Sequence, residues 1–159
     1  MKLSFGMIFS IILIIVFLSF AFYAIKIFLN MQTTMQVGKF VEELRNDVDK
    51  MWKSSQGSQE REYILPKKID YICFVDYNSN KKGGNIEKYS TLKKVYYENE
   101  NFFFYPVGSS LGIDACEIKH INLEKITQEQ NPFCIENKKG KINIVLKKDF
   151  GEALVNIEN

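Results

Sequence analysis

The chain has 159 residues, of which 46% are hydrophobic and 25% charged, a composition that excludes a disordered chain and a membrane protein with many spans. Residues 1–53 carry six basic and four acidic side chains, whereas residues 54–159 carry 15 of each. Nucleic-acid-binding domains usually have a basic excess, so this neutral balance argues against nucleic acid as a partner. The length suits one domain with an appendage.

The N-terminal segment predicts a membrane helix. The uncharged run Leu3–Ile25 exceeds the roughly 20 apolar residues that a helix needs to cross a bilayer. A cleaved secretory signal has a shorter apolar core, and here the run continues past the small residues of Ser19–Ala21 that would mark its cleavage site. We therefore expect a single-pass protein held in the lipid bilayer. Only Lys2 and the terminal amine precede the run, which favours an exported, extracellular head.

The helix is expected to continue beyond the membrane, from about Leu3 to about Trp52. No proline interrupts this stretch, and Arg45 and Asp49 form an opposite-charge pair four residues apart. Apolar residues recur there at intervals of three and four, the spacing of one helical stripe. These helix-packing residues are Val37, Phe40, Val41, Leu44, Val48, Met51 and Trp52.

A short leader ending in Gly6, an apolar helix directly after it and an amphipathic continuation below a β-rich head resemble the type IV pilin-like proteins, in particular archaeal ones with a class III signal. The resemblance covers about residues 1–52. It implies that a dedicated peptidase cuts between Gly6 and Met7, and that the apolar helices of many copies pack into a filament core. Archaeal pilins often carry a basic residue where Phe5 stands, and bacterial pilins a glutamate where Ile11 stands. The alternative is an unprocessed anchor with a stalk.

Short apolar runs separated by turn residues predict a β-rich head after a flexible loop at residues 54–59. Strands are expected at 61–66, 68–77, 101–106, 113–123 and 150–158, a hairpin over 133–146 and a short helix from residue 86 to 96. We predict an α+β fold: a transmembrane helix and amphipathic stalk over 1–53, then a head over 54–159 built on a small antiparallel sheet or sandwich.

The three cysteines, Cys73, Cys116 and Cys134, each lie in an apolar, strand-like run. In an exported head two of them are expected to form a disulfide, although the spacing does not select the pair. We predict Cys116–Cys134, the two that lie closest in sequence and bracket a loop. The alternative is three buried thiols.

No set of side chains has the spacing of a catalytic or metal site. His120 is the only histidine, and it stands with Cys116 in a C-x3-H pattern without the Cys-x2-Cys pair of common zinc frameworks. The tripeptide Asp149–Gly151 matches a kinase motif by chance, because the chain has neither the other motifs nor the length of a kinase. We expect no enzyme activity, no cofactor and no metal.

These features predict a membrane-anchored structural protein, a pilin-like subunit whose helix contacts copies of itself. The alternative is a monomeric, membrane-tethered binding module for a surface ligand or partner protein. A groove lined by Tyr96, Tyr97 and Phe102–Phe104 would favour the second function.

Overall fold

A computed structural model of the chain describes residues 5–159 and confirms the predicted α+β class: a long apolar N-terminal helix is followed by antiparallel sheets. Helix α1 runs Phe5–Lys53, and the predicted start at Leu3 lies outside the described residues. The chain divides into two compact units, one ending at Thr33 and the other running Thr34–Asn159. This boundary differs from the predicted one after residue 53, because the second part of α1 supplies core residues to the head.

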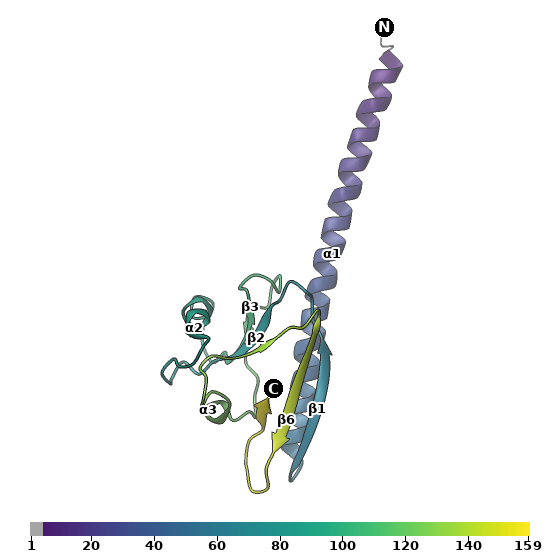
Figure 1. Cartoon of the computed structure of the whole chain (residues 1–159). Helices are drawn as coiled ribbons and strands as arrows, with labels where there is room; N and C mark the ends of the chain where they lie inside the picture. The colour runs from purple at the N-terminus through teal and green to yellow at the C-terminus, as the bar shows by residue number, and fades with distance from the viewer. Residues whose placement is uncertain (1–4) are drawn as a thin grey trace. The chain divides into compact units, whose positions relative to one another are not determined.

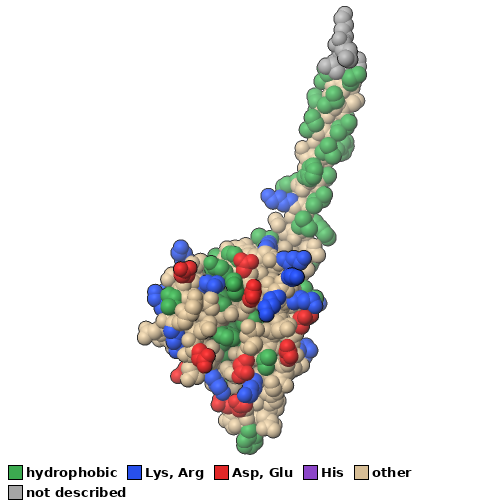
Figure 2. All heavy atoms as spheres, in the orientation of Figure 1, with side chains coloured by type: hydrophobic (Ala, Val, Ile, Leu, Met, Phe, Trp, Pro, Cys, Tyr) green, Lys and Arg blue, Asp and Glu red, His purple; other side chains and the backbone are tan. Residues whose placement is uncertain are grey.

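The first part of α1, up to Thr33, exposes apolar side chains on every face, and its first charged residue, Lys26, comes only in its last turns (Figure 2). Within residues 5–159, α1 is the one helix long and apolar enough to cross a membrane. Its hydroxyl groups are satisfied within the helix: Ser10 Oγ donates to the Gly6 carbonyl at 2.9 Å and Ser19 Oγ to the Ile15 carbonyl at 2.8 Å. Such bonds let a serine sit in an apolar environment without an unpaired polar group.

The head contains two antiparallel sheets and two short helices, α2 (Ile86–Leu92) and α3 (Leu123–Ile126) (Figure 1). One sheet has the order β1-β6-β7 and the other the order β4-β3-β2-β5. The strands are β1 (Gly57–Ile64), β2 (Tyr71–Phe74), β3 (Phe102–Tyr105), β4 (Ala115–Cys116), β5 (Phe133–Glu136), β6 (Lys141–Lys148) and β7 (Asn156–Glu158).

The main core of the head forms where the second part of α1 packs with both sheets. The Phe40 ring lies 5.3 Å from the Tyr63 ring of β1 and 6.0 Å from the Phe102 and Phe104 rings of β3, measured between centroids. These contacts make the helix part of the fold and not a separate stalk.

One charged side chain of α1 is also buried in this core. Asp47 is 4% exposed, and its Oδ2 accepts hydrogen bonds from Arg61 Nε at 3.0 Å and from the Tyr63 hydroxyl at 2.9 Å. Both partners lie on β1, so the carboxylate is paired as a buried charge must be and ties the helix to this strand.

The four-stranded sheet is covered on both faces. Ile72 and Phe74 of β2 point into the main core, whereas Cys73 and the following Val75 point into a second, smaller core with Leu92 of α2. This alternation follows from the two-residue period of a strand. Figure 1 shows β2 and β3 between α1 and α2.

The predicted hairpin over residues 133–146 is wrong in its pairing. β5 pairs with β2, and β6 pairs with β1 in the other sheet. The turn between them is held by Asn137, whose Nδ2 donates to the carbonyls of Pro66 at 3.0 Å and Ile69 at 2.7 Å. Long-range bonds therefore send the two strands to different sheets, which a local turn pattern does not reveal.

Several strand predictions are wrong in their extent. Only β2 forms within 68–77 and only β7 within 150–158. The loop after α1 is shorter than predicted, because β1 begins at Gly57. Of the strand predicted at 113–123, only β4 forms. The backbone does not stay extended beyond it, since His120 has a φ of +64°. The backbone N–H and carbonyl of Ile118 bond to the side chain of Asn101 and not to a neighbouring strand.

Candidate functional site

The predicted helix-packing residues lie in or against the head's own core. Val37, Phe40, Val41, Leu44, Val48 and Met51 are buried there. Trp52 is half-buried and stacks on the His120 ring with centroids 3.7 Å apart and an interplanar angle of 4°. These side chains are therefore used within the chain and are not available to a neighbouring copy.

The residues of the predicted cleavage site lie in the first turns of α1. Both Gly6 and Met7 are exposed, and Met7 is 52% accessible. A Cβ built on Gly6 would meet nothing within 4 Å, so no packing requirement explains the glycine.

The predicted disulfide Cys116–Cys134 is wrong: the structure joins Cys73 to Cys134 and leaves Cys116 free. Cys73 and Cys134 are directly opposed on the neighbouring strands β2 and β5. Cys116 lies on β4 at the other edge of the sheet, about 14 Å from β5 at the usual strand spacing. It also points into the main core, whereas Cys134 packs on the α2 side.

The surroundings of Cys116 favour its protonated thiol. Burial raises its pKa to about 11, and nearby Arg45 offsets only part of this effect. A thiolate is the reactive form of cysteine, so a raised pKa keeps the side chain inert at neutral pH.

His120 is tied to α1. Its Nδ1 lies 2.9 Å from Asp49 Oδ1, and one ring face is covered by Trp52. Within residues 5–159 no group of three or more His, Cys, Asp or Glu side chains is arranged to hold a metal ion. The geometry of this histidine fits a contact that fastens the 117–121 segment to the helix.

The predicted aromatic groove does not form, because Phe102, Phe103 and Phe104 are all fully buried. Tyr97 is 83% exposed, while Tyr96 packs on Tyr77 with ring centroids 4.5 Å apart. Alternate burial of the three phenylalanines in two cores removes them from any ligand surface.

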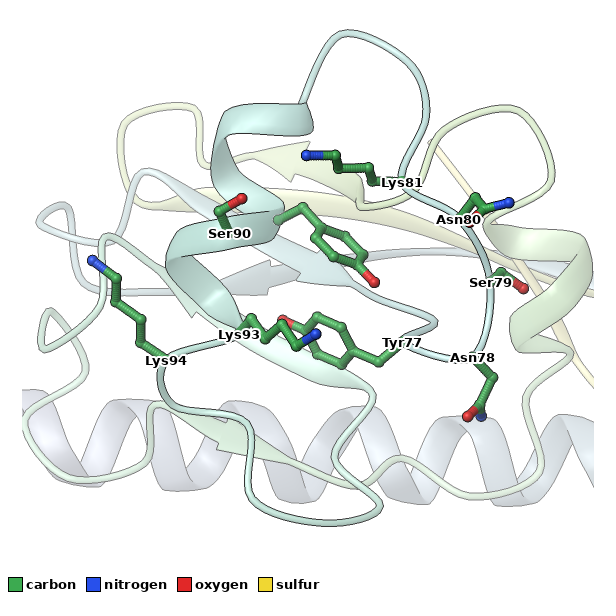
Figure 3. A pocket seen from close by; sticks show the side chains of 9 residues that line it. Tyr77, Asn78, Ser79, Asn80, Lys81, Ser90, Lys93 and Lys94 are labelled. Carbon is green, nitrogen blue, oxygen red and sulfur yellow. The ribbon is translucent and has the colours of Figure 1, made fainter.

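A different hollow opens beside these aromatic residues, between α2 and the loop after β2 (Figure 3). We call it the lysine–tyrosine pocket; its volume is about 630 Å³. Its lining contains three lysines, two tyrosines and four small polar residues, and no acidic residue. They are Tyr77, Asn78, Ser79, Asn80, Lys81, Tyr89, Ser90, Lys93 and Lys94.

The loop side of the pocket is held in place by two buried side chains. Asn131 is fully buried, and its Nδ2 donates to the Asp76 carbonyl at 2.7 Å. The carboxylate of Asp76 accepts from Asn78 N at 2.9 Å and Ser79 Oγ at 2.6 Å. A loop with such internal bonds is a fixed rim, which binding sites require.

The floor of the pocket is aromatic. The Tyr77 ring packs on Tyr89 at 4.9 Å and on Phe103 at 5.7 Å, measured between centroids. Burial raises the pKa of Tyr77 well above its usual value, and burial together with Asp76 raises that of Tyr89. Both hydroxyls therefore stay protonated at neutral pH and can donate hydrogen bonds.

Sequence reasoning missed this pocket. The lysine pairs at residues 81–82 and 93–94, two of the five in the sequence, are typical turn and helix-end charges when taken separately. Only the packing of α2 on β3 brings Lys81 and Lys93 to one hollow. Comparison of the chain with protein-family models, with curated proteins and with solved structures finds no match.

Proposed function

We propose that the protein is a membrane-anchored structural subunit of the pilin-like kind, with an exported head. The observation that carries this proposal is the composition of α1. Its first part exposes apolar side chains on every face, while its second part buries one stripe in the head. An all-apolar helix surface needs lipid or other apolar helices around it.

Two details of the first part support this environment. The hydroxyls of Ser10 and Ser19 are both satisfied by the carbonyl four residues earlier. Tyr23 stands close to the end of the apolar run, where amphipathic aromatic residues favour the membrane interface.

A disulfide between Cys73 and Cys134 suits a head that folds in an oxidising, extracellular compartment.

Self-association through α1 separates a pilin-like subunit from a plain anchor. The segment offers Ile, Leu, Val and Phe side chains, and the small residue Ser10, which stays in the chain after the cut, allows close approach of a second helix. Cleavage between Gly6 and Met7 would place the new terminal amine at the start of this surface.

Immunogold electron microscopy of native cells, with antibodies against the head, tests the proposal. We expect the gold label along surface filaments. Label spread over the cell envelope without filaments would contradict a filament subunit and favour the plain anchor.

The variant Ile15→Glu separates assembly from anchoring, because Ile15 lies in the middle of the apolar run and is 57% exposed. A single carboxylate in a membrane helix costs about 2.5–3.5 kcal/mol, which a long apolar run tolerates. We expect the variant to stay in the membrane fraction and to lose filaments, whereas the matched Ile15→Leu variant keeps both. Filaments of normal number from Ile15→Glu would count against packing of these helices.

A further inference from the structure

Beyond the structural role, we propose that the lysine–tyrosine pocket binds an anionic sugar, a saccharide unit that carries a carboxylate or a phosphate. The pocket combines three cationic side chains with hydroxyl and amide groups on an aromatic floor. This combination matches a ligand that has both a negative charge and many hydroxyl groups.

The lysines of the pocket are not held in ion pairs by the protein. Lys81, Lys93 and Lys94 are exposed, and in the part of the chain that the structure describes none of them forms an ion pair. Figure 3 shows Lys81 on the loop and Lys93 and Lys94 on the opposite rim at the end of α2. Like charges brought to one hollow repel each other, and an anion between them would remove this cost.

The Tyr77 hydroxyl lies below the surface of the pocket. It is buried and has no hydrogen-bond partner among the described residues. A buried hydroxyl without a partner costs free energy, and native structures seldom keep one without a reason. Tyr77 lines the pocket, and a ligand oxygen reaches its hydroxyl once the side chains that cover it shift.

The remaining lining favours a sugar over a simple inorganic anion. Asn78, Asn80 and Ser90 offer amide and hydroxyl groups that can donate to and accept from sugar hydroxyls. The Tyr89 ring gives an apolar face against which the C–H face of a sugar can pack. A volume of about 630 Å³ is within the range of small-molecule sites.

Charge favours a saccharide over nucleic acid. A nucleic acid presents one phosphate per nucleotide and needs a basic surface that follows the strand. Residues 54–159 have equal numbers of basic and acidic side chains, and Figure 2 shows both signs mixed on the visible face of the head. A local cluster of three lysines fits a short anionic ligand.

Isothermal titration calorimetry of the full chain in detergent micelles tests the inference. The probes are trigalacturonate for the carboxylate, glucose 6-phosphate for the phosphate, and maltotriose as the neutral sugar. We expect a Kd below about 1 mM for at least one anionic probe, and no binding of maltotriose. Which anionic probe binds more tightly identifies the acidic group. The inference is overturned if neither anionic probe binds, or if maltotriose binds equally well.

Variants then locate the site. The double variant Lys81→Glu/Lys93→Glu should weaken binding at least tenfold, because it reverses the charge on both rims. The matched control Lys68→Glu changes an exposed lysine outside the pocket and should leave the Kd within twofold. Tyr77→Phe keeps the ring and removes the hydroxyl, so a loss of about threefold to tenfold is expected. Equal binding by the double variant would refute the site.

One further probe tests whether the pocket prefers a nucleic acid to an anionic sugar. The oligonucleotide dT10 should bind more weakly than the better anionic sugar at the same salt concentration. Tighter binding of dT10, lost in the double lysine variant, would assign the pocket to nucleic acid instead.

Discussion

The two parts of α1 belong to one helix but obtain their apolar surroundings from different sources. The part up to Thr33 exposes apolar side chains on every face, and nothing in its own compact unit covers them. The part from Thr34 to Lys53 buries one stripe in the head and exposes charged residues on the opposite face. An all-round apolar surface predicts a partner outside the chain, whereas a single stripe predicts a partner inside it.

The largest effect on the stability of the head is expected from removing the second part of α1. A chain of residues 34–159 keeps the six buried apolar residues of α1, and one of residues 54–159 loses them all. We expect the first to give a cooperative thermal transition by circular dichroism. The second should show none, because the main core then lacks all six apolar side chains that α1 supplies. Cooperative unfolding of residues 54–159 would show that the helix is dispensable for the head.

A matched pair of phenylalanines compares the two parts in the full chain. Phe40→Ala removes a ring buried at 1% exposure between β1 and β3, so it should lower the free energy of unfolding of the head by about 3–5 kcal/mol. Phe20→Ala, at 68% exposure in the first part, should change it by less than about 0.5 kcal/mol. Urea unfolding followed by Trp52 fluorescence measures both. Similar losses from the two variants would remove the distinction.

The next largest loss of stability is expected from removing the disulfide. Cys73 and Cys134 are separated by 61 residues, and a bridge closing a loop of this size stabilises a domain by about 4 kcal/mol in the chain-entropy model. The double variant Cys73→Ala/Cys134→Ala should lose about 2–4 kcal/mol, while Cys116→Ser should lose less than half as much. Peptide mapping without reductant checks the pairing. A peptide pair joined through Cys116 would contradict the sheet order.

The smallest effect is the pH dependence of the free thiol. Burial raises the pKa of Cys116 from 9.0 to about 11, so the folded chain keeps this proton after the unfolded chain has lost it. The associated stability is complete below pH 9 and is lost as the pH rises toward 11. Tyr63, whose pKa is raised by burial and by Asp47, adds a loss of the same sign above pH 10.

Alkylation by iodoacetamide measures the same shift directly. At pH 8 the folded thiol should react about 100-fold more slowly than the thiol in urea, in proportion to the thiolate present. The Cys116→Ser variant should lack the stability loss between pH 9 and 10. Equal alkylation rates in the two states would show that the half-buried thiol of Cys116 does not have a raised pKa.

Local patterns in the sequence were sufficient for α1, for α2 and for the strand at Phe102–Tyr105, because period and turn residues are local properties. Pairing was not local. Asn137 directs β5 and β6 to separate sheets through bonds to carbonyls 68 and 71 residues away, and no neighbouring residue signals this. The wrong disulfide has the same origin, since sheet order and facing side decide which cysteines meet.

The lysine–tyrosine pocket shows the same limit for function. Its lysines come from a loop and from the end of a helix, and each pair is unremarkable in its own segment. Tertiary packing supplies both the shared hollow and the unpartnered hydroxyl of Tyr77. By contrast, the prediction of a helix long and apolar enough to cross a membrane needed only composition and length.

The N-terminus of the mature protein, measured by intact mass and peptide mass spectrometry on native membranes, distinguishes a pilin-like subunit from a plain anchor. Cleavage at the predicted site gives a chain that begins at Met7, with the apolar part of α1 intact and the head still attached. We predict this product as the major species. A mature chain that retains residues 1–6, or one cut after Ala21 so that most of the apolar run is lost, would contradict the proposal.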